Sequence, residues 1–87
     1  MRRVLGRFFG TLTDYCHGTV DTRKHTRATF PRENTEVRME IWDVRNLGRP
    51  SLLATFTPGG WSLKLAAIND IVGRQVDESE FAAAVRP

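Results

Sequence analysis

The chain has 87 residues, and 13 lysines and arginines against 10 aspartates and glutamates give it a formal net charge of +3. This length suits a single small domain over residues 1–87 and excludes a multidomain enzyme. The single cysteine, Cys16, excludes an intramolecular disulfide and fits a reducing compartment. We therefore expect a cytoplasmic protein, or one of the host-cell cytosol if it comes from a virus or phage.

The first predicted element is an amphipathic helix over residues 2–16. Its apolar residues recur at the spacing of one helical face, although two glycines weaken the helix. Phe8 and Phe9 must be buried against another part of the molecule, and Cys16, at the end of the same face, is expected to be buried too. The polar face carries Arg2, Arg3 and Arg7.

A basic loop is predicted for residues 17–34, with a short strand near residues 26–30. Gly18 is placed to end the preceding helix as its C′ residue. The positive charge of the chain is concentrated here and in the predicted helix, because residues 1–32 carry a net +5 and residues 33–87 a net −2.

An antiparallel sheet is predicted for residues 35–65. Its clearest strand alternates apolar Val37, Met39 and Ile41 with Arg38, Glu40 and Trp42, which places Trp42 on the polar face, opposite the core. The alternation changes phase after Ile41, and this predicts a bulge near residues 42–43.

A β-hairpin is predicted around Pro58-Gly59-Gly60, between alternating runs at residues 51–57 and 61–65. Proline at the second turn position and glycine at the third predict a type II turn. The apolar residues of 61–72 also fit a helical series, so a single helix there is the alternative to a strand followed by a short helix.

The C-terminal region, residues 66–87, is predicted to be short and helical. Asp77 stands three residues before Glu80, as an N-cap residue does, and Phe81 and Val85 lie one turn apart and would pack on the sheet. The predicted fold is therefore two-layer α+β: an N-terminal amphipathic helix, an antiparallel meander of three or four strands, and a short C-terminal helix.

No motif in the chain points to catalysis or to a cofactor. Cys16, His17 and His25 are the only thiol and imidazole groups, and they lack the spacing of a metal site or a nucleophile–base pair. Glu36 and Glu40 alternate with Arg38, which is typical of a solvated strand face. We therefore expect no enzyme, no metal and no cofactor.

The leading hypothesis is a non-enzymatic module that binds a macromolecular partner, in the first place another protein, through the basic loop and an exposed aromatic residue. Tryptophan and arginine dominate interface hot spots, and Trp42 is a stronger anchor candidate than Trp61. The predicted partner-binding residues are Arg23, Lys24, Arg27, Arg32, Arg38 and Trp42. Further contacts to an anionic surface are assigned to Arg2, Arg3 and Arg7.

Three alternatives use the same features differently. The arginines would also suit nucleic-acid binding without sequence preference, although no fingerprint of base readout is present. The helix over residues 2–16 would suit attachment to a membrane surface. The opposite charges of the two parts of the chain would suit a homo-oligomer, in which the basic third of one copy meets the acidic strand or C-terminal helix of another.

Overall fold

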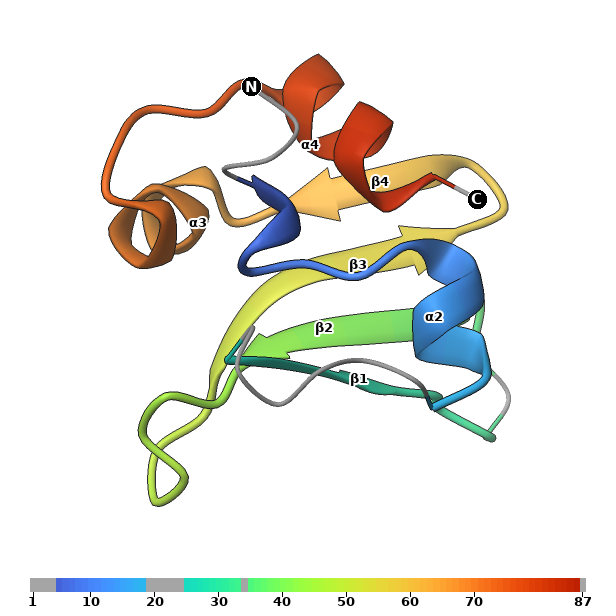
Figure 1. Cartoon of the computed structure of the whole chain (residues 1–87). Helices are drawn as coiled ribbons and strands as arrows, with labels where there is room; N and C mark the ends of the chain where they lie inside the picture. The colour runs from blue at the N-terminus through green and yellow to red at the C-terminus, as the bar shows by residue number, and fades with distance from the viewer. Residues whose placement is uncertain (1–4, 19–24, 34, 87) are drawn as a thin grey trace.

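The computed structural model describes residues 5–18, 25–33 and 35–86. Its centre is a four-stranded antiparallel sheet whose strands follow one another in chain order (Figure 1). The strands are β1 (Thr26–Thr29), β2 (Met39–Asp43), β3 (Ser51–Thr57) and β4 (Gly60–Leu63). The helices are α2 (Leu12–Cys16), α3 (Leu65–Val72) and α4 (Glu78–Val85).

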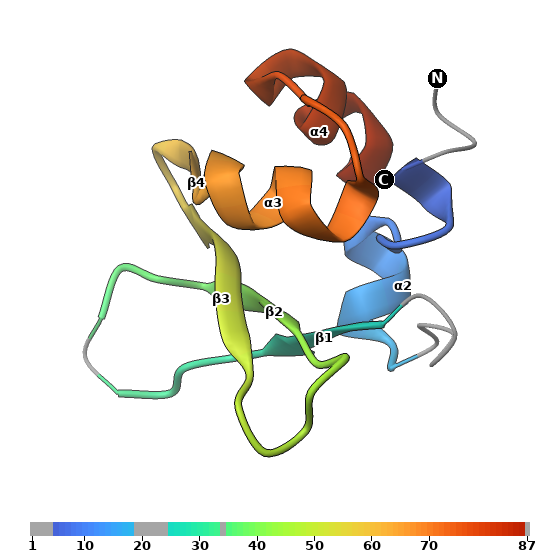
Figure 2. The ribbon, with the colours of Figure 1, turned by 90° about the vertical axis from the view of Figure 1, so that its left-hand side faces the viewer.

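The three helices lie on one side of the sheet, as the two views of the ribbon show together (Figures 1 and 2). This arrangement confirms the predicted two-layer α+β fold, with a meander of four strands. The connection between β1 and β2 projects away from the helices in Figure 2.

The predicted helix over residues 2–16 is wrong as one continuous element. A helical turn at Leu5 and Gly6 ends at once, and α2 begins afresh at Leu12. Thr11 caps the new helix: its Oγ1 accepts from the Asp14 amide at 3.1 Å, and Asp14 Oδ2 accepts from the Thr11 amide at 3.0 Å. This reciprocal capping box starts a second helix where the glycines had weakened the first.

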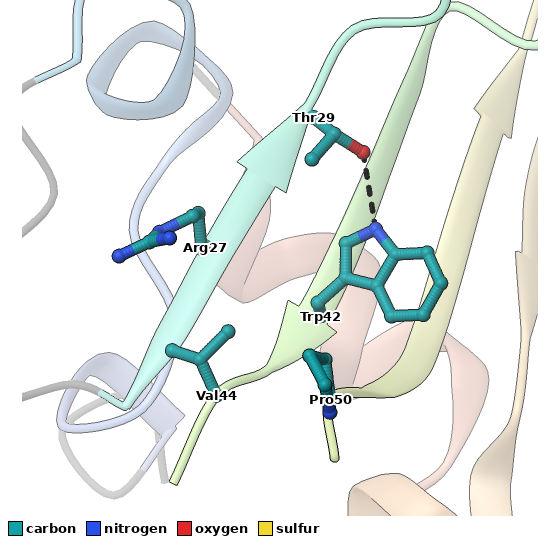
Figure 3. Close-up of a pocket in the computed structure, with 5 residues that line it drawn as sticks. All are labelled: Arg27, Thr29, Trp42, Val44 and Pro50. Atoms are coloured by element: carbon teal, nitrogen blue, oxygen red, sulfur yellow. Dashed lines mark hydrogen bonds between the residues drawn. The ribbon is translucent and has the colours of Figure 1, made fainter. Parts of the chain in front are cut away.

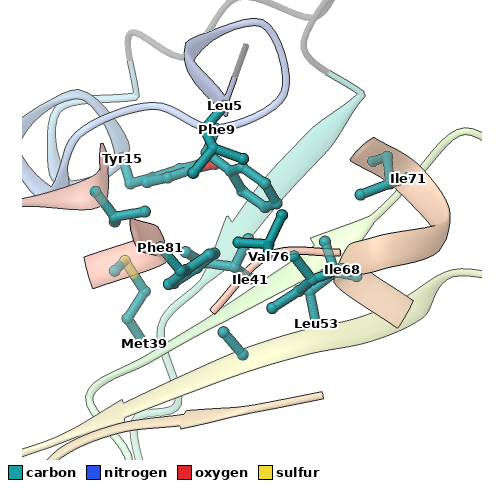
Figure 4. Close-up of a cluster of buried hydrophobic side chains, with 12 residues drawn as sticks. Leu5, Phe9, Tyr15, Met39, Ile41, Leu53, Ile68, Ile71, Val76 and Phe81 are labelled. Carbon is teal, nitrogen blue, oxygen red and sulfur yellow. The ribbon is translucent and has the colours of Figure 1, made fainter. Parts of the chain in front are cut away.

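The hydrophobic core lies between the helices and the sheet (Figure 4). Phe9 and Phe81 meet edge to face with ring centroids 5.0 Å apart, and Phe81 meets Trp61 in the same way at 5.4 Å. Phe9, Phe81 and Val85 are buried, and Phe8 packs against the cluster, as predicted. The first helical segment therefore contributes its apolar side chains to the interior.

The prediction that Cys16 is buried is wrong, because its side chain is exposed. Helix α2 turns Tyr15 into the core, and Cys16 follows about 100° further round the helix. Gly18, just beyond this helix, has a φ of 69°, as its predicted C′ role requires.

The bulge is present, but its extra residue belongs to β3. Ile41 pairs with Ala54 and Trp42 with Leu52, so Leu53 is the residue without a partner on β2. Leu53 and Ala54 are both buried on the helix side. The extra residue in β3 therefore adds a side chain to the core, and β2 keeps its alternation through Asp43.

The hairpin between β3 and β4 is confirmed, and α3 follows β4 directly, which rules out a single helix over residues 61–72. The type II turn is wrong: a positive φ occurs at Gly60, at 118°, and not at Gly59. Helix α4 begins as predicted, with Asp77 Oδ1 accepting from the Glu80 amide at 2.8 Å.

Candidate functional site

The sheet presents one face to the helices and the other away from them. Residues 39, 41 and 43 of β2 are buried, whereas residues 38, 40 and 42 are exposed or half-buried. The register aligns Arg27 with Trp42 and Leu52, and Thr29 with Glu40 and Thr55. These side chains form what we call the open face, defined by Arg27, Thr29, Glu40, Trp42, Leu52 and Thr55.

A shallow hollow of about 410 Å³ lies at the β1–β2 side of the open face (Figure 3). It is lined by Arg27, Thr29, Trp42, Val44 and Pro50. The guanidinium group lies on one side and the indole and proline rings on the other, with valine between them (Figure 3). The hollow thus offers apolar contact area beside one positive charge.

Hydrogen bonds fix the orientation of Trp42. Its Nε1 donates to Thr29 Oγ1 at 3.0 Å, and that hydroxyl donates to Glu40 Oε1 at 3.0 Å. The three residues come from neighbouring strands in register, so the backbone ladder itself supports the chain of hydrogen bonds. An indole held in this way loses little rotamer freedom when a ligand packs against it.

The ion pairs found among residues 5–18, 25–33 and 35–86 lie away from the hollow. Arg45 Nη2 contacts Asp43 at 2.7 Å and Asp70 at 2.9 Å, and Arg74 contacts Glu80 at 2.5 Å. The remaining arginines of the sheet and of the β1–β2 connection, which are Arg27, Arg32 and Arg38, are exposed and join none of these ion pairs of the described residues. Their positive charge is therefore available to a partner.

The Asp43–Arg45 pair also moves the pKa values of its members. Burial disfavours the charged carboxylate of Asp43, but the hydrogen bonds and charge of Arg45 outweigh it and hold that pKa below its usual value. The pKa of Arg45 is raised by its hydrogen bond to Asp43, against a smaller opposing effect of burial. The pair stabilises the end of β2. Both oxygens of the Asp43 carboxylate accept hydrogen bonds from Arg45, so this carboxylate is not available to a ligand.

The structure brings some predicted site residues together and separates others. Arg27 and Trp42 share the hollow just described. Arg32 and Arg38 line a second hollow of about 470 Å³, together with Glu33 and Glu36, so the charge there is mixed. Outside the described residues lie Arg2, Arg3, Arg23 and Lys24.

Arg7 is exposed in the N-terminal segment, whose apolar residues pack into the core on the helix side of the sheet. It is not among the residues that line the hollow with Arg27 and Trp42. Trp42 and Trp61, both expected to be exposed, are half-buried. The ring of Trp61 packs against Phe56 at 4.9 Å and against Phe81 at 5.4 Å, on the core side of the sheet.

Sequence reasoning missed Thr29, Val44 and Pro50 as parts of the hollow. Thr29 carries a usable signal, since it alternates with Arg27 along a predicted strand, but its pairing with Glu40 depends on a register that the sequence does not show. Two exposed apolar side chains were also missed: Phe30, 43% exposed, in the β1–β2 connection and Leu47, 71% exposed, in the β2–β3 connection.

No protein-family model, curated protein or solved structure matches this chain. None of the helices in the described parts is long and apolar enough to cross a membrane. In the same residues no group of three or more His, Cys, Asp or Glu side chains is placed to hold a metal ion. Membrane attachment through residues 2–16 stays a prediction; the apolar residues on which it depends, Leu5, Phe8, Phe9 and Leu12, pack in or against the core.

Proposed function

We propose that this chain is a non-enzymatic interaction module that binds a protein partner through the open face, with Trp42 as the anchor. The observation that carries the proposal is the hollow, in which an oriented indole lies beside Arg27, an arginine that joins none of the ion pairs found among the described residues. Tryptophan and arginine are the residues that most often dominate binding energy at protein interfaces.

Trp42 lies outside the buried core cluster, and this position supports a role beyond folding. Trp61, the other tryptophan, packs against the core cluster, whereas Trp42 does not belong to it. A half-buried tryptophan on the face away from the helices leaves apolar surface in contact with water, and a bound partner would bury that surface.

The test compares Trp42→Ala with Trp61→Ala, which removes the same side chain from the rim of the core. We expect Trp42→Ala to lower the thermal midpoint by less than about 4 °C, equivalent to less than about 1 kcal/mol in a domain of this size. Trp61→Ala should cost about 3 kcal/mol. Quantitative pull-down from cells of the source organism measures binding: proteins captured by the wild-type chain should not be captured by Trp42→Ala.

A collapse of stability in Trp42→Ala would assign this residue to the core and end the proposal. Equal capture of every bound protein by the wild type and by folded Trp42→Ala would end it as well. The partner could be a second copy of the same chain. Sedimentation of the wild type and of Trp42→Ala over a range of concentrations tests for such self-association and for its dependence on Trp42.

A second candidate function, binding of single-stranded nucleic acid, is favoured by the neighbouring positions of Trp42 and Arg27. Bases stack on aromatic rings and arginines neutralise phosphates in such sites. This candidate predicts retention on heparin beyond that of a charge-matched control protein, and an affinity that falls steeply with salt. No binding to single or double strands at low salt would exclude it.

A further inference from the structure

The open face carries an ordered series of charges along β2. Arg38 is exposed just before the strand, Glu40 follows on the same face, and Trp42 lies beside Arg27 of β1. With a rise of about 3.3 Å per residue, the two ends of this series lie about 13 Å apart. The order along the strand is therefore positive, negative, and then positive beside an apolar ring.

Glu40 is held in the middle of the series. Its carboxylate accepts from Thr29 Oγ1 at 3.0 Å, and the same hydroxyl accepts from Trp42 Nε1. The anchor and the negative charge thus belong to one hydrogen-bonded unit, and an extended ligand that packs against Trp42 and runs along β2 passes over Glu40.

We infer that the partner presents an extended segment with the complementary order of charges, an inference that rests on the proposed protein-binding function. An apolar residue with a neighbouring acidic one would occupy the hollow, with the acid against Arg27. A basic residue would face Glu40, and a second acid would face Arg38. In an extended chain the two acids stand about four residues apart, because the segment has the same rise as the strand beneath it.

Charge complementarity favours such a segment over a nucleic acid. A polynucleotide carries negative charge at every phosphate, so a strand crossing the open face would place phosphate over the Glu40 carboxylate. Like charges brought together at an interface oppose binding and select against the wrong partner. The nucleic-acid candidate therefore becomes one outcome of the test.

The experiment selects binders from a random dodecapeptide display library on the immobilised wild-type chain, with counter-selection on Trp42→Ala. We expect enriched peptides to contain an acidic residue next to an apolar one and a second acid about four residues away. Their affinity should fall about thirtyfold with Trp42→Ala and about fivefold at low salt with Arg38→Glu.

Charge reversals test the order of the charges. Selection on Glu40→Lys should replace the central basic residue of the peptides with an acidic one, and selection on Arg38→Glu should replace the distal acid with a basic residue. Arg86→Glu, which reverses an exposed arginine at the end of α4, is the matched control and should leave the selected peptides unchanged.

Peptides whose charges show no fixed position relative to the apolar residue, or do not change in the two reversals, would overturn the inference while leaving protein binding intact. Tighter binding of an oligothymidylate to Glu40→Lys than to wild type, with no peptide motif, would assign the face to nucleic acid. Failure to enrich any peptide on wild type over Trp42→Ala would remove the proposed function itself.

Discussion

Tyr15 ties the N-terminal segment to the sheet through one buried hydroxyl. The phenol oxygen accepts from the Gly10 amide at 3.1 Å and lies 2.7 Å from Thr26 Oγ1, which in turn donates to the Phe8 carbonyl at 2.5 Å. Because the threonine hydrogen is used on that carbonyl, the tyrosine donates to the threonine. Burial raises the pKa of Tyr15 and outweighs the opposing effect of the hydrogen bonds to Thr26 and Gly10.

Tyr15→Phe should lower the free energy of unfolding by about 1–2 kcal/mol, because it leaves the buried Gly10 amide and the Thr26 hydroxyl without this partner. Urea unfolding followed by circular dichroism measures the change. Thr13→Ala, an exposed substitution in the same helix, is the control and should shift stability by less than about 0.5 kcal/mol. Equal stability of Tyr15→Phe and wild type would show that the network does not hold the segment.

Helix α3 ends at Gly73, where glycine is required by the backbone conformation and not by lack of space for a side chain. Gly73 has a φ of 84°, its amide donates to the Asn69 carbonyl at 2.8 Å, and a Cβ added there would meet no atom within 4 Å. The cost of a side chain at this position is therefore the strain of the left-handed conformation, without a steric clash.

Gly73→Ala should destabilise the protein by about 1 kcal/mol, and Gly73→Asn by less, since asparagine tolerates the left-handed region better. Gly59→Ala is the matched control, because Gly59 has no positive φ and its added Cβ would make an ordinary contact with Thr57. Chemical unfolding of the three variants supplies the comparison. A loss in Gly59→Ala as large as in Gly73→Ala would contradict the conformational explanation.

The ion pairs of the described residues make the stability of the molecule depend on pH in the acid range. Arg45 joins the end of β2 to α3 through Asp43 and Asp70, and Arg74 joins the segment after α3 to α4 through Glu80. The pKa of Asp43 is lowered because Arg45 outweighs burial, that of Asp77 by the Glu80 amide, and that of Glu80 by Arg74. Each lowered pKa contributes stability at neutral pH that is lost on protonation.

For Asp43 this contribution is fully present above the ordinary carboxyl pKa of 3.8 and is lost as the pH falls through the lower pKa of the folded state. The thermal midpoint should therefore drop between about pH 4 and pH 2. Asp43→Asn should be less stable than wild type at neutral pH, and the difference should shrink in acid. Glu36→Gln, which removes an exposed carboxylate of the β1–β2 connection, should keep the wild-type profile, and a constant difference for Asp43→Asn would contradict the assignment.

Local signals in the sequence were sufficient for much of this architecture. Proline and glycine between two alternating runs predict the β3–β4 hairpin, and Asp77 before Glu80 predicts the start of α4. The alternation around Met39 and Ile41 places Trp42 on the face away from the core. Each of these signals depends on residues within a few positions of one another, where backbone preference and side-chain capping act directly.

The remaining features depend on residues far apart in the chain, and only their packing decided them. Tyr15 is buried with its hydroxyl against that of Thr26, a residue of β1, and this contact leaves Cys16 outside the core. The bulge at Leu53, the alignment of Arg27 with Trp42, and the meeting of Thr29 with Glu40 follow from the register between strands. The register is set by which side chains fill the core, and this is why the alternation of one strand predicts the face of Trp42 but not its neighbours.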